Sequence, residues 1–316
     1  MGKYGDWMRN EDEALLNRLG GTEIARKIAN GELTVRVVAL REPQGDKTHE
    51  VVIEPTPTLV YDKNGRRIPP QGMKSSVCDA NYGYCPTRLE QLPFGAKLKL
   101  AQEVFNDKSL TFVSVEQFFE RINALVMKIE ADETIKNVLK GAWYPFVIPG
   151  GLGVTAANYG DKMDKVLLSA VARAYTKAFP NRPFHNNLNG QLSGEVTIWQ
   201  GSRHERVLEA ASKEPVVGIY FPTALQGYSI NADREQMATL PEMFMLAGGL
   251  DTMCAMSMYA AELLRDNKTP CYDMAALAWR GWSLDCYAYD VSAFFRDGRR
   301  LAGAYDYIAG GLVALA

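Results

Sequence analysis

Acid–base chemistry in this chain has few histidines to draw on. Only His49, His185 and His204 supply an imidazole, the side chain that most often moves protons near neutral pH. His185 lies in a polar segment, and Ser229 follows an expected strand. We therefore take His185 and Ser229 as the candidate catalytic residues, although no complete nucleophile motif surrounds any serine or cysteine.

The segment from Phe184 to Gln191 is the densest run of neutral hydrogen-bonding side chains. Amides both donate and accept, so Asn187 and its neighbours would suit a sugar or a nucleotide base. The same residues also favour an ordinary turn, because asparagine and glycine tolerate left-handed backbone geometry. Both interpretations stay open, and Asn187 is a candidate ligand contact.

A second candidate is the glycine-rich turn with Gly150, Gly151 and Gly153. It follows an expected strand and precedes an expected helix, a position where backbone N–H groups can hold a phosphate. The spacing matches neither the dinucleotide-binding motif nor the P-loop. The alternative is that these glycines permit positive φ or close packing.

Residues 69–93 show no regular pattern and contain Tyr82, Cys78 and Cys85. A long irregular segment of this kind is often a lid or binding loop when it is ordered. Tyr82 is therefore a candidate ligand contact. The alternative is a connector between two lobes.

Large rings gather near the C-terminus, from Trp279 and Trp282 to Tyr287 and Tyr289. We expect a hairpin between 274–279 and 283–291, on which Asp285, Tyr287 and Tyr289 share one face. Such a face could stack on a sugar ring or a base, or it could belong to the core or to a subunit contact.

Composition narrows the class of protein. The 316 residues include 35 basic and 37 acidic ones, so no overall field favours nucleic acid or an anionic membrane. Charges interrupt the apolar region 243–264, so we expect no membrane segment. Five scattered cysteines argue against a disulfide framework. We expect a soluble cytoplasmic protein with no metal site, since no ligand spacing typical of zinc occurs, and the sequence indicates no particular cofactor.

The periodicities predict an α+β fold, with a mixed sheet packed against several helices. Helices are expected over 96–105, 115–139, 161–179 and 252–265, with strands at 144–148, 196–199 and 216–221. Ser114 and Gln117 fit a capping box. We expect a smaller β-rich lobe over residues 1–95 and a main domain over 96–316.

Two hypotheses for function follow. In the first, the chain is an enzyme or receptor for a small polar ligand, in a pocket where loops 69–93, 149–160, 184–191 and 226–231 converge. In the second, it is a non-catalytic interaction or assembly protein, such as a homo-oligomer, which the apolar C-terminal stretch and the aromatic segment favour.

Overall fold

A computed structural model describes residues 19–41, 47–55, 58–91, 93–298 and 300–316. The chain forms two compact units, residues 1–58 and residues 59–316. The first unit contains helix α2 (Thr22–Ala29) and two antiparallel strands, β1 (Leu33–Arg41) and β2 (Lys47–Pro55). His49, one of the three histidines, falls on β2.

The second unit is built on a mixed sheet. Among the described residues the sheet has eight strands, seven of them in the order β3-β6-β12-β8-β10-β11-β4, while β7 pairs with β12. The pairs β12–β8 and β11–β4 are parallel, and the others are antiparallel. The strands are β3 (Tyr144–Ile148), β4 (Phe184–Asn186), β6 (Val216–Gln226), β7 (Met245–Leu246), β8 (Cys271–Asp273), β10 (Leu284–Ala288), β11 (Ala293–Asp297) and β12 (Ile308–Leu315). This sheet and its helices confirm the predicted α+β class.

Helices follow the expected apolar periodicity. They are α3 (Phe94–Phe105), α4 (Val115–Glu130), α5 (Tyr159–Lys162), α6 (Leu168–Ala178), α7 (Glu205–Lys213), α8 (Ile230–Glu235) and α9 (Gly249–Leu263). Short 3-10 turns cover Lys136–Lys140 and Gln236–Ala238, and a π-helical stretch, Met163–Leu167, joins α5 to α6. The predicted capping box is present, since Ser114 and Gln117 exchange side-chain hydrogen bonds with each other's backbone N–H. No helix in the described part of the chain is long and apolar enough to cross a bilayer.

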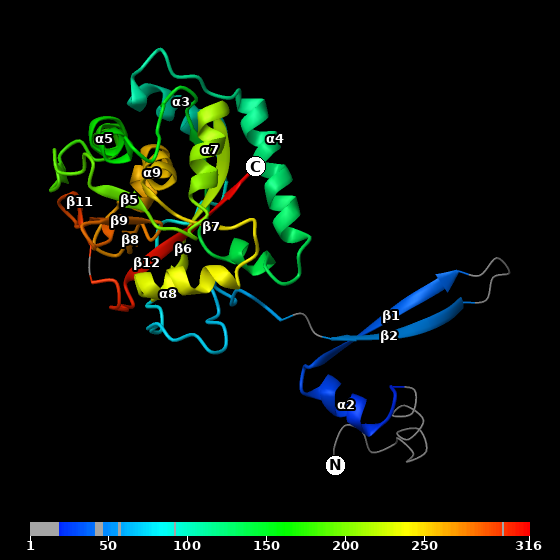
Figure 1. Cartoon of the computed structure of the whole chain (residues 1–316). Helices are drawn as coiled ribbons and strands as arrows, with labels where there is room; N and C mark the ends of the chain where they lie inside the picture. The colour runs from blue at the N-terminus through cyan, green and yellow to red at the C-terminus, as the bar shows by residue number, and fades with distance from the viewer. Residues whose placement is uncertain (1–18, 42–46, 56–57, 92, 299) are drawn as a thin grey trace. The chain divides into compact units, whose positions relative to one another are not determined.

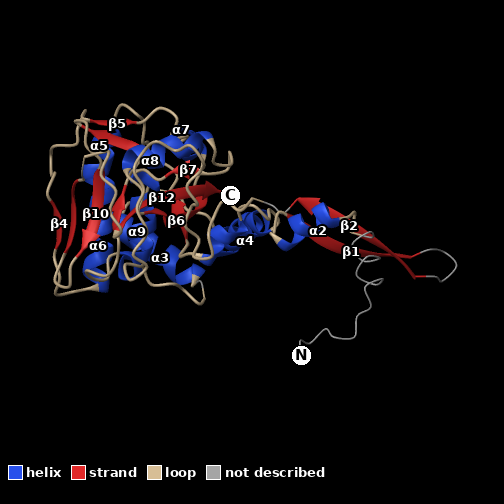
Figure 2. Cartoon of the chain, turned by 90° about the horizontal axis from the view of Figure 1, so that it is seen from below, coloured by secondary structure: helices blue, strands red, loops and turns tan. Residues whose placement is uncertain are grey.

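Helix α9 is the centre of the core. Nearly all of its residues are buried, including Met253, Met256 and Met258, as expected for a helix that is apolar on all sides. It packs against α6, α3 and β3. Figure 1 shows α8 on the opposite side of strands β6 and β12 from α9, and Figure 2 shows α6 and α9 next to the strands. The two faces of the sheet are therefore covered by different elements.

Strands β10 and β11 alternate strictly between these faces. Leu284, Cys286 and Phe295 are fully buried. Because successive side chains point to opposite faces, the intervening residues of both strands point the other way. That second face carries the site described below.

The expected hairpin forms only in part. Residues 274–279 and 283–291 contact each other where Met274 N donates to Leu284 O at 2.9 Å. Trp279 and Trp282 also form an isolated bridge around a turn. However, β9 (Leu277–Trp279) pairs with β5 (Val196–Ile198) in a separate sheet, whereas β10 pairs with β8 and β11. The turn residues Arg280 and Gly281 both have positive φ, and this local signal cannot report where the flanking strands find partners.

Candidate ligand site

Only two of the four loops expected to converge are seen to pack against each other in the described residues. Loop 69–93 joins loop 226–231, because Cys78 N donates to Gly227 O at 2.9 Å and Ser229 N donates to Ser76 O at 3.0 Å. Loop 149–160 instead meets the segment that follows β4. There, a Cβ added to Gly160 would lie 1.8 Å from the Leu192 carbonyl oxygen.

The structure keeps His185 and Tyr82 apart. His185 is exposed on edge strand β4, where its ring stacks on Phe294 at 4.9 Å. Tyr82 donates to Asp62 Oδ2 at 2.8 Å, and loop 69–93 pairs with the end of β6. Five strand spacings separate β6 from β4, which is roughly 24 Å.

The remaining sequence candidates have visible structural roles. Ser229 is buried, and its hydroxyl accepts from Ala232 N as the cap of α8. Gly150 packs against Thr111, and Gly151 and Gly153 have positive φ. The Asn187 backbone N donates to the carbonyl of Phe295 at 2.9 Å. These contacts bring none of the candidates into a shared site with His185.

A cavity of about 740 Å³ lies elsewhere, at one end of strands β8 and β10. Its volume is in the range of small-molecule sites. Four tyrosines and two cations dominate its walls. The lining residues are Gly83, Tyr84, Asn267, Lys268, Thr269, Cys271, Tyr287, Ala288, Tyr289, Arg296 and Tyr307.

Strand register builds one wall of this cavity. Tyr287 lies opposite Phe294, and Arg296 lies opposite Asp285, so these four side chains share a face. The Tyr287 and Phe294 rings are parallel within 11° at 5.1 Å. The Arg296 guanidinium carbon lies 4.1 Å from the centre of the Tyr287 ring. The result is a continuous stack that ends in a cation.

Hydrogen bonds fix the opposite rim. Gln226 is buried, and its Nε2 lies 3.0, 3.1 and 3.0 Å from the carbonyl oxygens of Asn81, Tyr84 and Asp306. Cys85 N donates to Lys268 O at 2.9 Å, and Cys271 N donates to Tyr307 O at 3.1 Å. Segments from three distant parts of the chain are thereby held around one opening.

A row of buried carboxyl groups runs across the sheet behind the wall. Asp285 and Asp273 are adjacent in register, Asp273 is adjacent to Gly310, and all three lie on the same face. A Cβ added to Gly310 would lie 2.3 Å from Asp233 Oδ2, so only glycine leaves room for this carboxyl group. Burial, together with the neighbouring Asp273, raises the pKa of Asp233 well above its ordinary value. Arg296 closes the row by donating to Asp285 Oδ1 at 3.2 Å.

Two other polar networks bond within the protein, and in the first of them His204 Nδ1 has no hydrogen-bond partner among the described residues. In the first, His204 Nε2 lies 2.7 Å from the Tyr159 hydroxyl, and His204 and Asp251 are completely buried. Burial lowers the pKa of His204 to about 4 and raises the pKa of Asp251 to about 8. Such a network, with every member surrounded by core side chains, specifies packing rather than binding.

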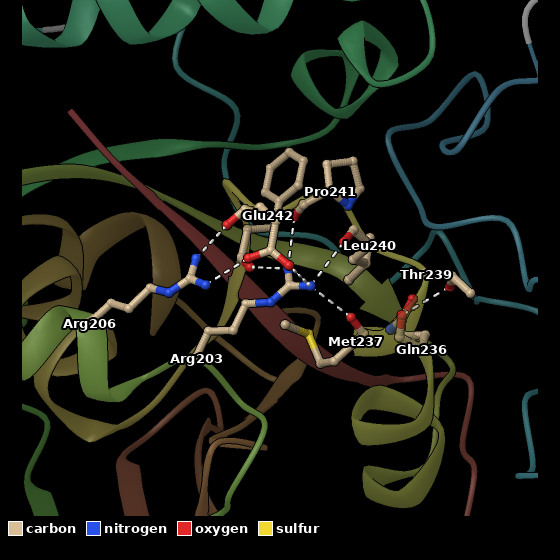
Figure 3. A network of polar contacts seen from close by, with 9 residues as sticks. Arg203, Arg206, Gln236, Met237, Thr239, Leu240, Pro241 and Glu242 are labelled. Carbon is tan, nitrogen blue, oxygen red and sulfur yellow. Dashed lines mark hydrogen bonds and ion pairs between the residues drawn. The ribbon is translucent and has the colours of Figure 1, made fainter.

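The second network surrounds Arg203 (Figure 3). Its guanidinium donates to four main-chain carbonyls, those of Met237, Leu240, Pro241 and Phe244, at 2.8–3.1 Å. It also pairs with Glu242 at 3.1 Å. Arg203 therefore fixes the segment that leads into β7, and its donors are used within the protein.

Other site types find little support in the described residues. No group of three or more metal-binding side chains gathers there, and the five cysteines are free thiols. A comparison with protein-family models found no match, and comparisons with curated proteins and with solved structures found none either.

Sequence reasoning found part of the cavity. It grouped Tyr287 and Tyr289, whose rings are indeed in contact at 5.3 Å. It missed Tyr84, Lys268, Arg296 and Tyr307. Apolar Ala293 and Phe295, followed by the polar Arg296, were the available signal for strand β11. The partners of that strand are not encoded locally.

Proposed function

We propose that this chain binds a small polar ligand that contains a ring, and that the ligand occupies the 740 Å³ cavity. The observation that carries the proposal is the wall itself, where Tyr287 is stacked between Phe294 and Arg296. Aromatic faces stack on sugar rings and bases, while tyrosine hydroxyls bond to polar substituents. The side chains that line the cavity are thus of the types that recognise small polar ring compounds.

The fixed rim supports the same proposal. Gln226 and the backbone bonds at Cys85 and Cys271 hold Tyr84 and Tyr307 in place before any ligand arrives. A site that is already ordered loses little conformational entropy on binding. An accidental surface hollow would not need three distant segments tied together at its edge.

Tyr287→Leu tests this proposal, with Tyr82→Leu as the matched control. Both substitutions remove a partly exposed tyrosine, but only Tyr287 lines the cavity. Saturation-transfer NMR on the full chain, with a mixture of nucleosides and monosaccharides, identifies a bound ring compound. We expect Tyr287→Leu to weaken its binding about tenfold and Tyr82→Leu to leave it unchanged. Equal effects of the two substitutions would refute the cavity as the site.

Self-association is a second candidate function, and the first unit favours it. None of the side chains described between residues 19 and 35 is buried, including Ile24 and Ile28 of α2. A two-stranded sheet of this kind is marginally stable unless it packs against something else. We propose that a second copy of the chain supplies that contact.

Light scattering on the full chain tests the assembly proposal. We expect a mass that rises with concentration, and a monomeric mass for an Ile24→Asp/Ile28→Asp variant. A Glu23→Gln variant on the same helix is the control, since Glu23 is exposed and paired only with Lys27 at 3.4 Å in the described structure. A monomeric mass for the unaltered chain at every concentration would rule the proposal out.

A further inference from the structure

We infer that the ring compound carries an anionic group, a phosphate or a carboxylate, and that Lys268 and Arg296 receive it. This inference rests on the proposed function, because it concerns the ligand of the same cavity. It names the chemical class to which that ligand belongs.

Arg296 presents unused donors to the cavity. Its Nε donates to Asp285 Oδ1 at 3.2 Å, and its plane lies over Tyr287. Within the described residues, neither terminal NH₂ group of Arg296 has a protein acceptor. These two groups form a planar fork that matches the paired oxygens of a carboxylate or phosphate. Stacking on Tyr287 and bonding to Asp285 hold the fork in one orientation.

Lys268 supplies a second positive charge at the rim. Its backbone is fixed from both sides, since its N–H donates to Asp266 Oδ1 at 2.9 Å and its carbonyl accepts from Cys85 N at 2.9 Å. The Lys268 ammonium forms no ion pair with any described residue. The nearby Asp266 is already paired with Arg265 at 2.8 Å. The ammonium is therefore available to an incoming anion.

The charges of the lining favour an anion over a cation. The lining contains two cations, Lys268 and Arg296, and no carboxylate. Asp285 lies behind the wall and offsets the charge of Arg296, which leaves Lys268 as the net positive charge at the opening. A cluster of tyrosines alone could hold a quaternary ammonium ion, but these two cations would repel one. A neutral sugar or base would use the rings and leave both cations with water.

Matched pairs of probes test this inference by calorimetry on the full chain. The pairs are adenosine with adenosine 5′-monophosphate, glucose with glucose 6-phosphate, and phenol with 4-hydroxybenzoate. In at least one pair, we expect the anionic member to bind about tenfold more tightly. We also expect that preference to shrink at high salt, as it does for partly exposed charges.

Lys268→Gln and Arg296→Gln should each reduce the preference for the anionic member to about threefold or less. Lys213→Gln is the control, because Lys213 is an exposed lysine on α7 that pairs with Glu209 at 2.8 Å, and it should keep the full preference. Lys268 lies in an exposed loop, so its substitution does not threaten folding. An Asp285→Asn/Arg296→Gln variant removes the charge of Arg296 without leaving a buried carboxylate behind.

The outcomes separate the two proposals. If the neutral members bind through Tyr287 and the anionic members bind no more tightly, the anion inference is wrong and the proposed function stands. An anion preference that survives both single substitutions also overturns it. If no probe of any pair binds, the proposed function and this inference fall together.

Discussion

Two arginines of this chain are used in opposite ways. Arg203 gives its terminal donors to four carbonyls and pairs with Glu242, and its side chain is 13% exposed. Arg296 donates through Nε to a single carboxylate, and its side chain is 40% exposed. A guanidinium whose donors are all bonded within the protein holds a fold together. One that is fixed by a ring and a carboxylate, with its fork open, is prepared for a ligand.

The surroundings of Arg203 and Arg296 also differ. The acceptors of Arg203 come from residues 237–244, a short stretch of chain that needs an anchor (Figure 3). The neighbours of Arg296 are Asp285 and Tyr287 on β10, a strand that is also held by its pairing with β8. The comparison predicts that losing Arg203 damages stability, whereas losing Arg296 damages binding more than stability.

The largest effect is expected for Arg203→Ala. Four partly buried carbonyls lose a charged donor at once, so we expect the free energy of unfolding to fall by about 3 to 4 kcal/mol. Urea denaturation measures it. Arg206→Ala is the control, since Arg206 is exposed and pairs with the same Glu242 at 2.6 Å, and its loss should cost less than about 1 kcal/mol. Similar losses for the two variants would mean that the carbonyl bonds contribute little.

A smaller effect is expected for Arg296→Ala. The substitution removes the guanidinium that bonds to the buried Asp285 carboxylate, and partial exposure of Arg296 screens that pair. We expect a loss of about 1 to 2 kcal/mol. Urea denaturation measures this loss as well. A loss as large as that of Arg203→Ala would contradict the comparison.

The carboxyl row behind the cavity predicts a dependence on pH. The folded chain keeps a proton on Asp233 that the unfolded chain has released, because burial raises the pKa of Asp233. The folded state then binds more protons, so the free energy of unfolding falls as pH rises above the ordinary range of aspartate. Asp251, with its pKa raised to about 8, acts with the same sign. The pKa of His204 is lowered to about 4, so His204 has the opposite effect. Below about pH 6.5 the unfolded imidazole takes up a proton and the folded one does not, so the free energy of unfolding falls as pH falls.

Asp233→Asn isolates this contribution. The neutral amide cannot titrate, so between about pH 6.5 and 9 we expect the variant to lose less stability than the unaltered chain. Chemical denaturation at a series of pH values measures both slopes. Asp297→Asn, at an exposed position on β11, should keep the original slope. Identical slopes for the Asp233 variant and the unaltered chain would show that Asp233 is already ionised when folded.

The fold was predictable where its causes are local. The capping box at Ser114 and the shared side of Tyr287 and Tyr289 follow from residues close in sequence. The cavity was not predictable from the sequence, because it depends on parallel pairing between β8 and β12, which lie far apart in the chain. No short-range pattern encodes that register.

The polar segment shows the same limit of composition, because one of its amides bonds within the protein. Asn186 donates to Asp164 at 2.7 Å, and its side-chain oxygen accepts from Leu188 N at 3.0 Å. This amide is therefore used within the turn, as asparagine often is. A count of polar side chains cannot distinguish groups that bond to their own backbone from groups that face a cavity.

The smallest effect on stability is expected for Tyr287→Phe. This variant also tests whether the cavity wall around Arg296 differs from the structural network around Arg203. The ring that stacks on Phe294 and under Arg296 is retained, so the free energy of unfolding should change by less than about 0.5 kcal/mol. Arg296 keeps its orientation, and ligand stacking should persist. Any loss in affinity then measures the hydroxyl alone. If Tyr287→Phe instead destabilises the chain as much as Arg203→Ala does, the cavity wall is a structural element like the Arg203 network, and its open fork has no special preparation for a ligand.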